Sequence, residues 1–166
     1  MAHSLNLLTS DQLSSPDDLF QFALAELQLG VKKSAHPFHL VSFSTCANNI
    51  PDVRTVVSRG INEHLSHVRI HSDNRSQKIN QLQSNKNVAL LYYSVQQKLQ
   101  VRLHGSAHVV SHEDTLSNHF NFSSLHSNLC YAFPIAPGSP IQQQTKEAAY
   151  DNINVSTFDA FESDAR

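Results

Sequence analysis

The fold is decided by the stretch from Arg54 to Gly105, which reads RTVVSRGINEHLSHVRIHSDNRSQKINQLQSNKNVALLYYSVQQKLQVRLHG. Its pattern predicts two strands, a short helix and two further strands. Several polar side chains stand where the apolar pattern does not require them. They are Arg54 in the first strand, Ser76, Gln77 and Lys78 at the helix start, and Gln100 and Arg102 on the last strand.

The second half of this stretch has the clearest periodicity. Residues 98–110 alternate, with apolar or small residues from Leu99 to Val109 on one face and polar residues on the other. Residues 88–93 are almost continuously apolar, which predicts a strand buried on both faces. Before the strand at 88–93, Ser76 is the expected N-cap of a helix that runs to about residue 84.

Upstream, residues 38–45 predict a further strand, with Val41 and Phe43 on one face. Turn residues follow at 48–52, a strand at 53–58, a turn at 59–62 and a strand at 68–72. Near the N-terminus, Ser15 and Pro16 start an amphipathic helix and Gly30 is expected to end it. This helix is expected to cover one end or one face of the sheet.

Downstream of residue 110 the pattern is weaker. Ser111 predicts a helix start, further helical turns are expected near 124–130 and 142–150, and prolines mark a loop between them. The tail after Asp151 has no strong period and no apolar run, so the sequence leaves open whether a final strand is present. Five strands in meander order with helices at the junctions predict a mainly β fold with peripheral helices, a small antiparallel barrel. The expected organisation is a lead-in at 1–14, a barrel domain at 15–140 and a C-terminal extension at 141–166.

Composition limits the classes of function. The formal net charge of −2 provides no global basic field, so neither nucleic acid nor a membrane surface is an expected partner. No apolar run approaches a membrane span, and residues 1–6 do not resemble a signal peptide. Cys46 and Cys130 have neither metal nor disulfide spacing, which favours reduced thiols in a cytoplasmic protein.

The residue pattern bears on two kinds of site, an anion site and a metal or catalytic site. A helix start with Lys78 in its first turn and Arg54 nearby is suited to an anion, such as a phosphate-bearing cofactor. The alternative is that Lys78 is solvated and Arg54 pairs with an acid such as Asp52. The eleven histidines are scattered, so no metal site is expected, and no nucleophile has a base marked by the sequence.

The residues of the central stretch also resemble the pyridoxamine 5′-phosphate oxidase-like, FMN-binding split barrels. The resemblance covers about residues 35–140. It rests on an ordered set of segments: Arg54-Thr55-Val56-Val57-Ser58-Arg59, then Ile70-His71-Ser72-Asp73, then Ser76-Gln77-Lys78, then Asn85-Lys86-Asn87, and finally Gln100-Val101-Arg102-Leu103-His104-Gly105. The resemblance implies a split β-barrel of Greek-key type with FMN as cofactor, and a homodimer with FMN at the interface.

The resemblance also implies roles for individual residues. Arg54 and Lys78 would bind the FMN phosphate, with Ser76 and Gln77 beside them. The backbone from Thr55 through Val56 to Val57 would line the flavin ring. The remaining cofactor contacts would come from Arg59, His71 and Ser72, and from Gln100 on the partner side.

The positions that would hold a substrate differ from the oxidase pattern. Arg59 stands where the oxidase has a lysine, His119 replaces a tyrosine, Ser123 replaces an arginine, and Ser127 agrees. Arg59, His119 and Ser127 are thus the candidate substrate-binding residues, the small-molecule substrate is unknown, and no catalytic residue is assigned. The sequence predicts an FMN-binding oxidoreductase-type protein that transfers a hydride. The alternatives are a non-catalytic flavin carrier or sensor, and a structural barrel without cofactor.

Overall fold

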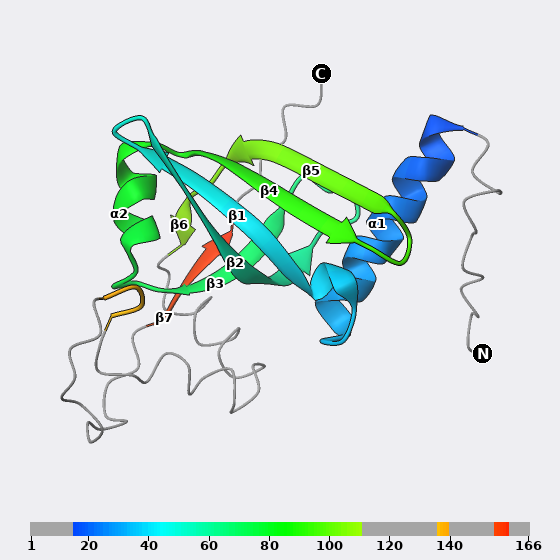
Figure 1. The fold of residues 1–166 in the computed structure, drawn as a ribbon, viewed down its shortest axis with the longest axis horizontal. Coiled ribbons are helices and arrows are strands. Elements are labelled where there is room, and N and C mark those ends of the chain that lie inside the picture. Colours follow the sequence, from blue (N-terminus) through cyan, green and yellow to red (C-terminus); the bar gives the residue numbers. More distant parts are fainter. Residues whose placement is uncertain (1–14, 111–135, 140–154, 160–166) are drawn as a thin grey trace.

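The computed structural model describes residues 15–110, 136–139 and 155–159, the last of these as backbone alone. Figure 1 shows a twisted antiparallel sheet with a helix at each end. The elements in chain order are α1 (Pro16–Lys32), the 3₁₀ helix η2 (Pro37–His39), β1 (Leu40–Ala47), β2 (Ile50–Ile61), β3 (Val68–Asp73), α2 (Gln77–Ser84), β4 (Asn87–Ser94), β5 (Leu99–Ser106), β6 (Val109–Val110) and β7 (Val155–Asp159).

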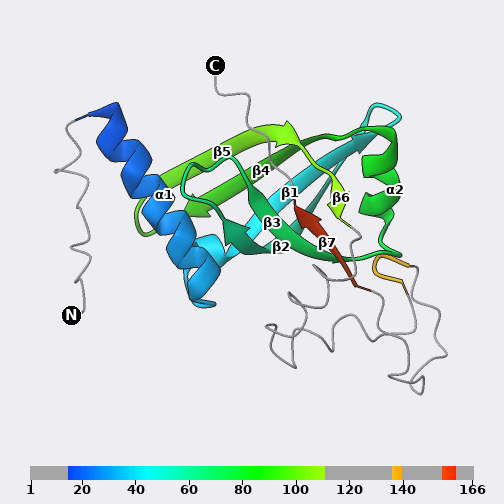
Figure 2. The same ribbon diagram turned by 180° about the vertical axis from the view of Figure 1, so that it is seen from behind.

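The sheet has the strand order β5-β4-β1-β2-β3-β7-β6, with every pairing antiparallel. Its two edge strands, β5 and β6, are separated in the chain by Ala107 and His108 alone. The chain therefore leaves one edge of the sheet and joins the other, which curls the sheet into a barrel. Helices α1 and α2 lie at opposite ends of this barrel (Figure 2). The predicted mainly β antiparallel barrel with peripheral helices is confirmed.

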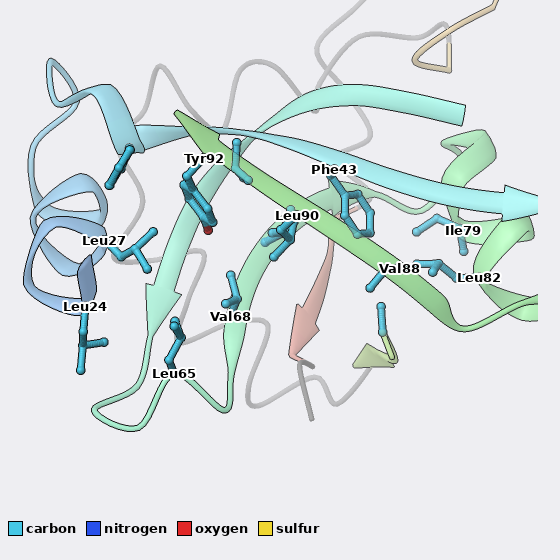
Figure 3. Packing of buried hydrophobic residues seen from close by; sticks show 14 residues of the cluster. Leu24, Leu27, Phe43, Leu65, Val68, Ile79, Leu82, Val88, Leu90 and Tyr92 are labelled. Carbon is cyan, nitrogen blue, oxygen red and sulfur yellow. The ribbon is translucent and has the colours of Figure 1, made fainter. Parts of the chain in front are cut away.

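The core lies inside the barrel (Figure 3). Its side chains come from alternate positions of the strands, as predicted for Val41 and Phe43 of β1. On β4, however, Leu91 and Tyr93 are 39% and 53% exposed, so the prediction of a strand buried on both faces is wrong for this chain. The reason is that the sheet packs on the core with one face, while no described part of the chain covers Leu91 and Tyr93 on the outer face.

Strand β2 is longer than predicted at both ends. Asn48 and Asn49 have φ values of +52° and +61°, as in a two-residue hairpin turn, so β2 already begins at Ile50. At its other end the expected turn at 59–62 is wrong, because the strand continues to Ile61. A register shift between Ser58 and Gly60 makes Arg59 the extra residue of a β-bulge.

Helix α1 begins as predicted and ends later. The Ser15 hydroxyl accepts a hydrogen bond from the backbone N–H of Asp18 at 3.1 Å. Gly30 does not end the helix, which continues to Lys32. A Cβ atom on Gly30 would lie 2.4 Å from the backbone oxygen of Phe38. Glycine is therefore needed here for close packing of α1 against η2.

The C-terminal part of the chain contributes β7, which pairs with β3 and β6. The tail thus supplies a final strand, a point that the sequence left open. Strand β7 falls in the segment 141–166, which the sequence set apart from the barrel; the domain partition itself remains a prediction. The helices predicted after Ser111, near 124–130 and near 142–150 lie outside the described residues. Within the described part, no helix has both the length and the apolarity of a membrane span.

Candidate functional site

The start of α2 holds a lysine between two hydroxyl groups. Ser76 is the N-cap residue of α2, yet its side chain makes no capping bond to the helix backbone. Instead its Oγ accepts a hydrogen bond from Lys78 Nζ at 2.6 Å. The same ammonium donates to the Oγ of Ser72, at the end of β3, at 2.8 Å. The ammonium group is thus fixed where β3 passes into α2.

The position of Lys78 changes its acidity. Burial and, to a smaller extent, the positive charge of Arg54 lower the pKa of Lys78 from 10.5 to about 8. The carboxylates of Asp73 and Asp52 act in the opposite direction but do not compensate. A bound anion would raise this pKa again, because an opposite charge stabilises a desolvated cation.

The turn that leads into α2 is fixed by Asp73 and Arg75. The buried Asp73 accepts hydrogen bonds from the backbone N–H of Arg75 at 2.8 Å and from its guanidinium at 2.6 Å. Burial raises the pKa of Asp73, but the bonds and charge of Arg75 outweigh it, so the pKa is lowered overall. Arg75 was not among the predicted site residues. The spacing Asp-x-Arg directly before the helix could have indicated its contact with Asp73.

Arg54 lies on β2 with its guanidinium bound to four acceptors. Its Nη1 donates to the Thr45 hydroxyl at 2.7 Å and to the Phe43 backbone oxygen at 3.2 Å. Its Nη2 donates to Asp52 at 2.5 Å and to the Gln81 side-chain oxygen at 3.0 Å. The alternative that Arg54 pairs with Asp52 is therefore observed, whereas the alternative of a fully solvated Lys78 is not.

Gln81 connects the arginine to the helix. It lies three residues after Lys78 and so on the same face of α2. Its amide nitrogen donates to Asp52 at 3.0 Å, and its oxygen accepts from the Thr45 hydroxyl at 2.6 Å. The bond from Gln81 is the main reason that the pKa of Asp52 is lowered, with Arg54 adding to it against the effect of burial. Sequence reasoning missed Gln81 and Thr45, because their contact depends on the docking of α2 against β1.

The structure brings together some of the other predicted residues. Gln77 is exposed in the first turn of α2, and His71 precedes Ser72 on β3. Thr55 is exposed, and by strand alternation it and Val57 point to the opposite face from Arg54 and Val56. Arg59 lies at the bulge of β2, and the predicted residues His119 and Ser127 are outside the described residues.

Gln100 lies apart from the β2 residues. It is exposed on β5, opposite Tyr93, and strands β4 and β1 separate β5 from β2. Three strand spacings of about 4.8 Å place it roughly 14 Å from β2 along the sheet. A single chain therefore does not bring Gln100 to the predicted flavin-lining segment. No group of three or more histidine, cysteine, aspartate or glutamate side chains suited to a metal occurs among the described residues.

Fold and site together define a small antiparallel barrel in which two cationic side chains gather at a helix start. The model of the family described as "Pyridoxamine 5′-phosphate oxidase, FMN-binding domain" matches residues 19–111, more than half of the chain. The chain belongs to this family, and the family resemblance predicted from its motifs is confirmed. FMN is the cofactor of the family's domain, which confirms the predicted cofactor.

Solved structures share the fold at low sequence identity. A pyridoxamine 5′-phosphate oxidase-related, FMN-binding protein from Nostoc punctiforme is 20% identical, with a TM-score of 0.64 over 89% of this chain and 81% of that protein. PhzG from Burkholderia lata, in complex with tetrahydrophenazine-1-carboxylic acid, is 14% identical, with a TM-score of 0.64 over 90% of this chain and 77% of its own. General stress protein 26 from Bacillus anthracis is 14% identical, with a TM-score of 0.55 over 83% and 87%. No curated protein sequence matches the chain.

Proposed function

We propose that this protein is an FMN-dependent oxidoreductase-type protein that transfers a hydride between a small substrate and the flavin. The observation that carries the proposal is the ammonium group of Lys78, held by Ser72 and Ser76 at the start of α2. A partly desolvated cation at a helix N-terminus fits the phosphate of FMN. When bound, FMN supplies the redox chemistry, and the protein supplies binding and orientation.

Within this proposal, Lys78 and Arg54 hold the phosphate by charge. The Ser76 and Ser72 hydroxyls hold the lysine in place, and Gln77 is exposed beside them in the first turn of α2. The segment 55–57 continues β2 away from Arg54. In the proposal, the ribityl chain and the ring of FMN extend from the phosphate along the backbone of this segment. His71 and Arg59 border the same region in the proposal, Arg59 lying about 17 Å along the strand from Arg54.

We also propose that the protein is a homodimer with FMN at the interface. The outer face of the β5-β4-β1-β2 sheet carries large apolar side chains that are exposed among the described residues, including Leu40, Val53, Leu91 and Tyr93. Such a face fits burial against a second copy. A second copy also offers a route for Gln100 to reach the flavin, since within one chain it lies too far away. Its cytoplasmic location remains a prediction from the sequence.

The colour of the protein tests the cofactor. The purified chain is mixed with FMN, desalted and scanned in the visible range. We expect the flavin spectrum to remain with the protein at about one FMN for each chain. A colourless protein that binds no FMN would contradict both this function and the flavin carrier, and would leave a structural barrel.

The alternative function is a non-catalytic flavin carrier or sensor. It is motivated by His119 and Ser123, which stand where the oxidase has a tyrosine and an arginine. The FMN-loaded protein is tested for reduction by NADPH or NADH, and for oxidation of pyridoxamine phosphate with release of peroxide. Either reaction favours the enzyme, whereas a stably bound flavin that performs neither favours the carrier.

A further inference from the structure

The guanidinium of Arg54 has almost no unused hydrogen-bonding capacity. An arginine side chain has five N–H groups. Four hydrogen bonds from the two terminal nitrogens of Arg54 go to Phe43, Thr45, Asp52 and Gln81. An incoming phosphate that binds this guanidinium in the usual two-pronged way must therefore replace a bond that already exists.

Asp52 is the acceptor that a phosphate can replace most easily. Thr45 and Gln81 are buried, so water could not replace the bond that either of them would lose with Arg54. The Asp52 side chain is 42% exposed, so water can solvate it when it is released. It is also the one negatively charged group among the four acceptors, and a phosphate offers the guanidinium the same kind of bond.

We propose that Asp52 competes with the cofactor phosphate for Arg54 and thereby sets how strongly the site prefers FMN to riboflavin. This inference rests on the proposed FMN site. When the phosphate binds, Asp52 gives up Arg54 and keeps its bond from Gln81. The carboxylate then lies beside a second anion, which weakens phosphate binding. Asp52 is thus a specificity-determining residue that acts on the phosphate and not on the ring.

The substitution Asp52→Asn tests the competition, because it removes the charge and keeps the shape. FMN and riboflavin are titrated into the apoprotein and followed by the change in flavin fluorescence. We expect the variant to bind FMN roughly three- to tenfold more tightly, as expected for the loss of one partly exposed like charge, with riboflavin binding unchanged. Glu63→Gln is the matched control, since it changes the net charge equally at an exposed position in the β2–β3 loop.

A second experiment tests whether Asp52 acts on FMN binding through Arg54. In a protein that carries Arg54→Gln, Asp52→Asn should improve FMN binding less than it does in the unmodified protein. Unchanged or weaker FMN binding by Asp52→Asn, in a protein whose unmodified form binds FMN, would overturn the competition alone. Equal tightening of FMN and riboflavin, or equal tightening by Glu63→Gln, would overturn it as well. Absence of FMN binding in the unmodified protein would instead remove the proposed function on which it rests.

Discussion

The two ends of the barrel are closed by helices that use different physical means. At the α1 end, Leu24 and Leu27 belong to the buried core together with Phe38 and Tyr92. The rings of Phe38 and Tyr92 lie edge to face with their centroids 5.8 Å apart. Figure 3 shows Leu24, Leu27 and Tyr92 at this end. At the α2 end, Ile79 and Leu82 also reach the core. Four polar residues are buried beside them, however: Ser72, Asp73, Ser76 and Gln81.

On the proposed function, this difference separates an end of the barrel that contributes stability from an end that binds the cofactor. Apolar burial contributes about 25 cal/mol per Å² and needs no partner of defined geometry. Buried polar groups lower stability unless each is paired, and a desolvated ammonium such as that of Lys78 loses its proton more readily than a solvated one. The α1 end has a buried acid too, Glu26, but His36 and Gln97 bind it and tie the helix to neighbouring loops. The contrast predicts that substitutions at the α1 end change stability and those at the α2 end change binding.

The largest effect is expected at the α1 end from Gly30→Ala. The new methyl group would lie 2.4 Å from the Phe38 backbone oxygen, and backbone cannot move aside as a flexible side chain can. We expect the free energy of unfolding in urea to fall by about 2–3 kcal/mol, even though alanine favours helices. The affinity of the folded protein for FMN should not change.

The exposed position Gln21 on the same helix provides the control. Gln21→Ala should change the free energy of unfolding by no more than about 0.5 kcal/mol. An unfolding free energy of Gly30→Ala equal to or above that of the unmodified protein would mean that α1 and η2 do not pack as closely as in this structure.

At the α2 end, Lys78→Met should weaken FMN binding and leave the stability of the fold intact. A lost charge-assisted contact of about 1.5–3 kcal/mol weakens FMN binding by roughly ten- to a hundredfold. Riboflavin, which lacks the phosphate, should lose much less. The unfolding free energy of the apoprotein should stay unchanged or rise, since the desolvated charge is gone.

Fluorescence titrations with both flavins and urea unfolding of the apoprotein measure these effects. Lys86→Met, at an exposed lysine just beyond α2, is the matched control and should bind both flavins as before. Equal losses of FMN and riboflavin affinity in Lys78→Met would show that the lysine acts through folding and not through the phosphate.

The local features of both ends could be predicted from the sequence. The alternation of β5, the N-cap at Ser15 and the buried pair Ile79 and Leu82 follow from periods and caps that involve residues close in sequence. Arg54 and Lys78 were also recognised, because charged residues stood where apolar periodicity needed none and because an ordered family pattern contained both.

Features that depend on tertiary contacts could not be predicted in this way. The contacts of Gln81 with Thr45 and Asp52 join residues 36 and 29 positions apart, and no local pattern marks them. Gly30 resembles a helix stop until η2 is seen to pack against it. Strand β7 is completed by its pairing with β3 and β6, so its own sequence carries little signal.

The smallest expected effect is a pH dependence that also separates the two ends. With the folded-state pKa of Lys78 near 8 and an ordinary value of 10.5, the unfolded chain binds more protons between these values. The contribution of Lys78 to stability therefore rises with pH over this range in the unbound protein. A bound phosphate would raise this pKa, so FMN binding takes up part of a proton, and its affinity should fall by about three- to tenfold between pH 7.5 and 9.5. FMN titrations and urea unfolding at several pH values measure the two pH dependences. Lys78→Met should show neither the rise in stability nor the fall in FMN affinity. Gly30→Ala should keep the fall in FMN affinity, because its lysine is intact. An FMN affinity that stays constant to pH 9.5 in the unmodified protein would mean that Lys78 does not contact the phosphate.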